Sequence, residues 1–160
     1  MNLSPGLGNA PMQGWAFRPV YLPEGLNGDV PKIGGEPARI LIVEDDFLIA
    51  MSIEDVARQM GMQVVGIATA SAEAQRLCAA EKPDFATMDI RLADGESGIE
   101  TARTLQHEHG VRSLFVSAFC HGANRRASED SQPLGWISKP FTTAQLATAF
   151  RMAVKQLQPE

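Results

Sequence analysis

The stretch ARILIVEDD, residues 38–46, runs from a short apolar segment into three adjacent acids, Glu44, Asp45 and Asp46. Its first part, RILIV at 39–43, is β-branched and nearly all apolar, which is typical of a strand buried on both faces of a sheet. Three neighbouring carboxylates are unfavourable, because each raises the free-energy cost of ionising the next. Something at the end of this strand must therefore offset that cost.

The bulk composition fits a single globular domain and excludes several classes of protein. The 160 residues are 44% hydrophobic and 21% charged, with 19 acidic against 14 basic side chains, a balance that disfavours nucleic-acid binding. No apolar run approaches the roughly 20 residues of a membrane span, and the N-terminus does not resemble a signal peptide. Cys78 and Cys120 show no metal-ligand spacing, which favours a reduced, cytoplasmic setting.

The composition changes near residue 38. Residues 1–37 hold 7 of the 14 glycines and 6 of the 10 prolines, so we expect an N-terminal extension that builds no core of its own, followed by one domain at 38–158. The extension nevertheless contains Trp15, Phe17 and Tyr21, and solvated tails are usually poor in aromatic residues. It either docks on a surface of this chain or of a partner, or stays solvated, and part of it could be a cloning remnant.

Two sequence patterns alternate after residue 38. Short β-rich apolar runs predict strands, and between them amphipathic segments with Ser, Thr or Asp at the start predict helices. The polar stretch 120–133 stands where a further helix belongs and predicts a short or mobile one. The expected strands are 39–43, 63–67, 84–88, 112–117 and 134–138, and the expected helices are 46–60 (Asp46 cap), 71–81 (Ser71 cap), 97–110 (Ser97–Glu100 capping box) and 142–157 (Thr142–Gln145 capping box).

Five strands that alternate with helices predict an α/β fold with helices on both faces of a parallel sheet. Right-handed crossovers then favour a flavodoxin-like, doubly wound five-stranded sheet with strand order 2-1-3-4-5. In such a sheet, ligands bind beyond the carboxyl ends of the strands, next to the first and third strands.

Chemically active side chains follow four of the predicted strands. Glu44 and Asp45 follow the first strand, Asp89 the third, Ser117 ends the fourth and Lys139 follows the fifth. Oxygen-ligated Mg²⁺ is held by a few carboxylates and waters, so a bound Mg²⁺ would resolve the repulsion among the acids. The sequence therefore predicts a magnesium site at this edge of the sheet.

Four motifs together resemble the receiver domain of two-component response regulators. They are ILIVEDD at 40–46, MDI at 88–90, FVSA at 115–118 and SKPF at 138–141, each at a strand end and in order along the chain. The resemblance covers about residues 38–157. The stretch DIRLADGESGIE at 89–100 is similar to receivers of bacterial general-stress signalling, which are served by HWE-type histidine kinases.

The resemblance implies a role for each residue of this edge. Asp89 is the expected nucleophile, which takes a phosphoryl group from a kinase phosphohistidine as an acyl phosphate. Lys139 would neutralise phosphoryl oxygens, Ser117 would donate a hydrogen bond to one of them, and a cis peptide before Pro140 would aim the ammonium group inward.

The same resemblance implies the ligands of Mg²⁺. Asp45 would bind the ion directly, Glu44 directly or through water, and Asp89 and the backbone carbonyl of Arg91 would complete the protein ligands. Asp46 is the extra acid, and we expect it to cap the following helix.

The sequence departs from the usual receiver pattern at several positions. Ala93 stands where many receivers carry proline, and Gly98 arrives one residue late after Asp89. Arg91 places a long cationic side chain two residues beyond the nucleophile. Trp136 occupies the place of the switch aromatic, where it either swings inward or simply packs.

We therefore expect a single-domain, cytoplasmic response regulator with no output domain after residue 160. It would accept a phosphoryl group from a sensor histidine kinase, and either signal by contact with a downstream protein or act as a phosphate sink, with at most self-dephosphorylation as enzymatic activity. Two alternatives remain. One is a receiver-like binding module without phosphorylation. The other is an aspartyl-nucleophile phosphatase, against which Arg91 stands where a second acid would be expected.

Overall fold

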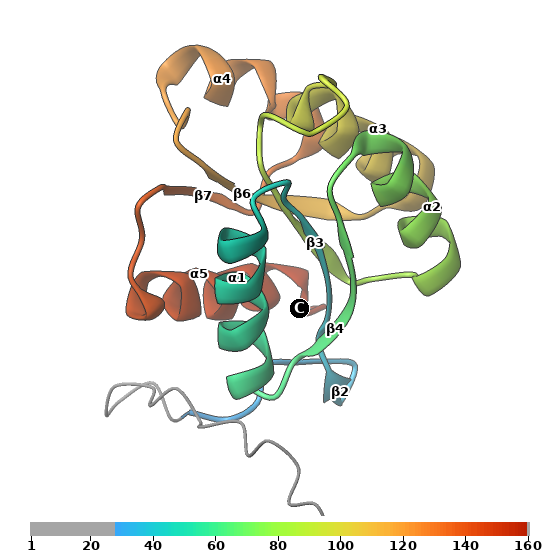
Figure 1. The fold of residues 1–160 in the computed structure, drawn as a ribbon. Coiled ribbons are helices and arrows are strands. Elements are labelled where there is room, and N and C mark those ends of the chain that lie inside the picture. Colours follow the sequence, from blue (N-terminus) through green and yellow to red (C-terminus); the bar gives the residue numbers. More distant parts are fainter. Residues whose placement is uncertain (1–27, 160) are drawn as a thin grey trace, which may run out of the picture.

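The computed structural model describes residues 28–159, so most of the predicted extension, including Trp15, Phe17 and Tyr21, lies outside the described residues. The described chain forms a five-stranded sheet covered by helices, and a separate two-stranded hairpin (Figure 1). The elements in chain order are β1 (Lys32–Ile33), β2 (Glu36–Pro37), β3 (Arg39–Val43), α1 (Phe47–Gln59), β4 (Gln63–Ala68), α2 (Ser71–Glu81), β5 (Phe85–Met88), α3 (Gly98–His109), β6 (Arg112–Ser117), α4 (Gly122–Ala127), a 3₁₀ turn (Glu129–Ser131), β7 (Gly135–Ser138) and α5 (Thr143–Leu157).

The main sheet has five parallel strands in the order β4-β3-β5-β6-β7. Numbered along the predicted strands this is 2-1-3-4-5, which confirms the predicted α/β doubly wound fold. Helices α1 and α5 cover one face of the sheet, and α2 and α3 cover the other (Figure 1). The first predicted strand, β3, lies between β4 and β5, and helices cover both faces of the sheet. Strand β3 is therefore buried on every side.

The burial of β3 on both faces explains why apolar and polar residues do not alternate along it. Ile40 and Ile42 belong to the core beneath α1 and α5, where the rings of Phe85 and Phe150 meet edge to face at 6.1 Å. The intervening residue Leu41 belongs to the opposite core, beneath α2 and α3. Because both faces of the strand are buried, both sets of alternating residues have to be apolar.

The structure confirms the predicted N-terminal caps of α1 and α5. Asp46 caps α1 by accepting hydrogen bonds from the N–H groups of Leu48 at 2.9 Å and Ile49 at 3.1 Å. Thr142 and Gln145 form the predicted capping box at the start of α5.

One predicted cap is wrong, and one predicted capping box is incomplete. Ser71 is the first residue of α2 rather than its cap, and its N–H donates to the Asp94 carboxylate at 2.8 Å, so a residue from a distant loop satisfies this helix end. Ser97 does cap α3, through the N–H of Ile99. Its predicted partner Glu100 instead pairs with Arg103 at 2.6 Å, which leaves the capping box incomplete.

The polar stretch 120–133 forms only a six-residue helix, α4, and the 3₁₀ turn, and no residue of α4 is buried. This agrees with the predicted short helix. Residues 32–37, at the end of the predicted N-terminal extension, form the β1–β2 hairpin across Gly34 and Gly35, whose φ angles of 60° and 90° suit the turn. Within residues 28–159, no helix combines the length and apolar character needed to cross a membrane.

Candidate functional site

The backbone brings the strand ends to one edge of the sheet, at the top of the view in Figure 1. Hydrogen bonding continues one residue past three strands. Glu44 N–H donates to Ala68 O at 2.9 Å, Asp89 N–H to Val43 O at 3.0 Å and Lys139 N–H to Ser117 O at 3.1 Å. Rigid strands rather than loops therefore position these three residues, as a precise site requires.

Three acids meet at this edge. Carboxylate oxygens of Glu44, Asp45 and Asp89 all lie within 4.8 Å of one another. Glu44 is 1% exposed and Asp89 is 7% exposed, whereas Asp45 is open to solvent. A cluster of hard carboxylate oxygens with one open side fits Mg²⁺, which keeps several waters when it binds a protein. Asp46 points away into its capping role, as expected.

Lys139 supplies positive charge to the two buried acids. Its Nζ lies 2.6 Å from Glu44 Oε2 and 2.9 Å from Asp89 Oδ2. The peptide bond between Lys139 and Pro140 is cis, as the resemblance to receiver domains implies. Glu44 after β3 and Asp89 after β5 are therefore compensated in part by the ammonium group of the residue that follows β7.

Burial sets the protonation of this cluster. Burial, aided by the charge of Asp89, raises the pKa of Glu44 from 4.5 to about 7, and the hydrogen bonds from Lys139 and the Asp46 N–H offset this only in part. Burial lowers the pKa of Lys139, but its hydrogen bonds to Glu44 and Asp89 outweigh burial and leave that pKa raised. Lys139 is thus a cation at neutral pH, while Glu44 exchanges its proton there.

Both oxygens of the Asp89 carboxylate have a donor. Ile90 N–H donates to Oδ1 at 2.7 Å and Lys139 Nζ donates to Oδ2 at 2.9 Å. The loop after Asp89 is held as well, because Gly98 N–H donates to Ile90 O at 2.7 Å and Ala93 N–H donates to Thr69 O at 3.0 Å. The orientation of Asp89 is therefore fixed before any ligand arrives.

Ser117 lies beside Lys139 in the backbone, but its hydroxyl group faces its own loop. Ser117 is fully buried, and its Oγ accepts a hydrogen bond from Phe119 N–H at 3.3 Å. The thiol of Cys120 donates to Ser117 O at 3.1 Å and to Ile137 O at 3.2 Å, which ties the ends of β6 and β7 together. The hydroxyl thus acts as an acceptor here, and its predicted hydrogen bond to a phosphoryl group would use its O–H as the donor.

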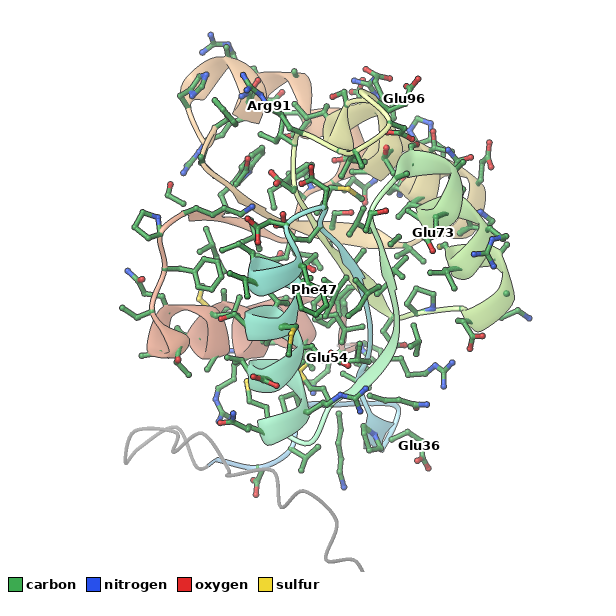
Figure 2. The ribbon with its side chains drawn as sticks, viewed as in Figure 1. Glu36, Phe47, Glu54, Glu73, Arg91 and Glu96 are labelled. Carbon is green, nitrogen blue, oxygen red and sulfur yellow. The ribbon has the colours of Figure 1, made fainter. Side chains whose placement is uncertain are left out.

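Arg91 makes a contact that sequence reasoning missed. Its guanidinium carbon lies 3.9 Å from the ring centre of Phe119, a cation–π pair that joins the loop after β5 to the loop after β6. Figure 2 shows Arg91 near α4. The sequence feature that could have indicated this contact is Phe119, a lone aromatic residue two positions after Ser117 at the start of a polar stretch. The proposed metal contact of the Arg91 carbonyl stays a prediction.

Trp136 packs rather than standing free. Its ring stacks on Phe115 with centres 4.3 Å apart and planes 11° apart, and Arg125 lies 5.8 Å from the indole ring centre. Of the two sequence alternatives, this conformation corresponds to packing. An inward swing of Trp136 would have to break the stack on Phe115.

The sequence matches the response regulator receiver domain family over residues 40–151. The chain is 29% identical over 122 residues to the transcriptional regulatory protein PdtaR of Mycobacterium tuberculosis, covering 76% of this chain and 59% of PdtaR. It is 33% identical over 116 residues to the phyllosphere-induced regulator PhyR of Methylorubrum extorquens, covering 72% of this chain and 43% of PhyR. The chain therefore spans about half the length of these two relatives.

A solved structure agrees with these matches. The receiver domain of Erythrobacter litoralis PhyR superposes with a TM-score of 0.65 at 32% identity, over 74% of this chain and 90% of that chain. The predicted likeness to general-stress receivers is confirmed by this similarity to PhyR, a general stress response regulator. With the acids, the lysine and the cis proline at the same edge of the same sheet, the chain belongs to the response regulator receiver domain family.

Proposed function

We propose that this chain is a response regulator that accepts a phosphoryl group on Asp89 from a sensor histidine kinase. It then signals by contact with a downstream protein or acts as a phosphate sink. The observation that supports this is the setting of Asp89, whose carboxylate lies within 4.8 Å of two further acids and 2.9 Å from the Lys139 ammonium group. Asp45 is open to solvent beside Asp89, and we expect the kinase phosphohistidine to approach from that side.

The transfer needs positioning and charge neutralisation more than covalent assistance. A carboxylate oxygen of Asp89 forms a bond to phosphorus while the phosphorus–nitrogen bond of the phosphohistidine breaks, and the bonding electron pair stays on the imidazole. Ile90 N–H and Lys139 hold the carboxylate, and Lys139 is placed to neutralise the phosphoryl oxygens. Glu44, Asp45, Asp89 and the Arg91 carbonyl would hold Mg²⁺, which supplies further neutralisation of charge when bound. Ser117 would donate a hydrogen bond from its hydroxyl to the phosphoryl group.

Binding of Mg²⁺ should depend on pH through Glu44. Because the pKa of Glu44 is about 7 in this buried site, protons compete with the cation below that pH. We expect the affinity for Mg²⁺ to fall by up to about tenfold per pH unit below neutrality, and to level off above it. Titration calorimetry in two buffers with different ionisation enthalpies measures both the affinity and the proton released.

The Glu44→Gln variant tests this prediction, because glutamine keeps the shape of the side chain but does not titrate. In this variant the affinity for Mg²⁺ should be weaker, and it should no longer depend on pH near neutrality. An unchanged pH profile in this variant would show that Glu44 is not the competing group.

The kinase-facing surface is expected beside the acids. Leu48 lies two residues after Asp46 and is 75% exposed, which is unusual for a large apolar side chain unless a partner protein covers it. We expect Leu48→Asp to slow phosphotransfer from a cognate kinase by about tenfold or more, since buried apolar contacts dominate such interfaces. Labelling by a small phosphodonor should not change.

The matched control is Met152→Asp, because Met152 is also an exposed apolar residue, but on α5. Rapid-quench transfer kinetics with each variant separate the two surfaces. Equal slowing by Met152→Asp, or slowing of the small-donor reaction by Leu48→Asp, would contradict the assignment.

Phosphotransfer from a panel of purified histidine kinases tests the proposed function as a whole. At least one kinase should pass its label to the wild-type chain, and none should label Asp89→Asn, which keeps the size of the side chain but removes the nucleophilic carboxylate. Label that persists in Asp89→Asn would place the acceptor elsewhere and overturn the proposal.

A further inference from the structure

An apolar groove of about 380 Å³ runs between α1 and β4. Phe47, Ala50 and Met51 of the helix line it on one side and Ile67 of the strand on the other. Phe47 and Glu54 lie on the side of α1 that faces β4 (Figure 2). The acids Glu44 and Asp45 close one end of the groove, and Glu54 lies farther along it. The groove thus offers apolar walls and negative charge to an extended ligand.

We propose that residues 15–22 of the same chain, WAFRPVYL, bind in this groove. The segment carries four large apolar side chains, Trp15, Phe17, Tyr21 and Leu22. Pro19, with Pro23 directly after the segment, disfavours helix and favours an extended backbone. An extended segment presents side chains to alternating sides, so a narrow groove can take some of them while the others stay outside.

The described chain begins within reach of this groove. The side chain of Val30 lies against Gly61, directly beyond the last turn of α1. The 13 residues of α1 span about 20 Å. Six residues from Leu22 to Gly28 can extend about 20 Å, and 13 residues from Trp15 to Gly28 about 45 Å. The segment can therefore lie along α1 with Tyr21 and Leu22 near Glu54 and with Phe17 near Phe47.

Charge selects this groove over a second one. Arg18 is the only charged residue in the segment, and in the orientation above it approaches Asp45, which is open to solvent. The second groove, between β7 and α5, is lined by Trp136, Pro140 and Met152 and also lies within reach, but no charged residue lines it. It offers Arg18 no partner. The inference concerns binding alone and does not depend on phosphorylation.

Fluorescence of Trp15 in the full chain tests the proposal. The protein has two tryptophans, so Trp136→Phe leaves Trp15 as the only one. We expect blue-shifted emission and slow quenching by acrylamide, both independent of protein concentration. Red-shifted emission with rapid quenching would show a solvated segment, and protection that grows with concentration would show binding to a second copy; either result overturns the proposal.

Two substitutions locate the binding site in this background. Met51→Glu places a like charge in the acidic groove and should raise the acrylamide quenching of Trp15 several-fold, as should Arg18→Glu. Met152→Glu, the same change in the second groove, should have no effect. Circular dichroism melting checks that each variant is folded, and Phe47→Ser replaces Met51→Glu if the latter unfolds. Quenching that responds to Met152→Glu instead, or to none of these changes, would contradict the proposal.

Discussion

The Lys139→Met variant is expected to take up a phosphoryl group on Asp89 about a hundredfold more slowly than the wild type, which is the usual effect of removing one preorganised charge from a transfer site. In the structure, Lys139 Nζ is 2.9 Å from Asp89 Oδ2 and 2.6 Å from Glu44 Oε2. The lysine therefore neutralises the nucleophile before transfer, and it is placed to neutralise the phosphoryl group afterwards.

The same variant should be less stable, to an extent that depends on pH. Glu44 and Asp89 would become buried neighbouring carboxylates without their cation, which costs about 3 kcal/mol when both are ionised. Because the folded pKa of Glu44 lies above its unfolded value, Glu44 adds no penalty below the unfolded pKa; the penalty grows as the pH rises from the unfolded to the folded pKa and then levels off. The loss of unfolding free energy should thus be larger at about pH 8 than at about pH 5, and Mg²⁺ should restore part of it.

Urea unfolding at the two pH values and timed labelling with a small phosphodonor measure these effects. Lys155→Met is the matched control, because Lys155 is an exposed lysine on α5. It should match the wild type in both assays. Wild-type labelling rates in Lys139→Met would remove the lysine from the proposed chemistry.

Gly98→Ala should destabilise the fold by about 3 kcal/mol or more and disturb the site at the same time. Gly98 is the first residue of α3, and a Cβ there would overlap the Asp89 carbonyl oxygen and lie 2.9 Å from Ile90 Cα. Both obstacles are backbone atoms, so no side chain can rotate away. The backbone of the nucleophile itself would have to move, and phosphoryl incorporation should fall with it.

Gly122→Ala gives a matched control, since Gly122 is the first residue of α4 and a Cβ there would meet only Arg126 Nη1, at 3.5 Å. Its effect on the unfolding free energy should stay within about 0.5 kcal/mol. Chemical denaturation and intact-mass labelling of both variants make the comparison. Similar stability of the two alanine variants would mean that the loop after Asp89 adapts freely.

The sequence predicted the fold and the location of the candidate site for one physical reason. Apolar periodicity distinguishes buried parallel strands from amphipathic helices, and parallel strands place their carboxyl ends at one edge. Glu44, Asp89 and Lys139 follow strands directly, so their convergence depended only on the strand order.

Details that depend on contacts between distant segments could not be predicted. The start of α2 is satisfied by Asp94 from the loop after β5, and local sequence rules pointed to Ser71 instead. The Ser117 hydroxyl oxygen accepts a hydrogen bond from Phe119 N–H, and the Phe119 ring in turn packs against Arg91. Such choices among side-chain rotamers are decided by tertiary neighbours, which a single sequence does not display.

Intact-mass spectrometry after treatment with acetyl phosphate and Mg²⁺ tests the central claim most directly, because it needs no kinase. The wild-type chain should gain the mass of one phosphoryl group, with the modification mapped to Asp89, and chelation of Mg²⁺ or the Asp89→Asn substitution should abolish the gain. A wild-type chain that stays unmodified, or that carries the group on another residue, would contradict the account.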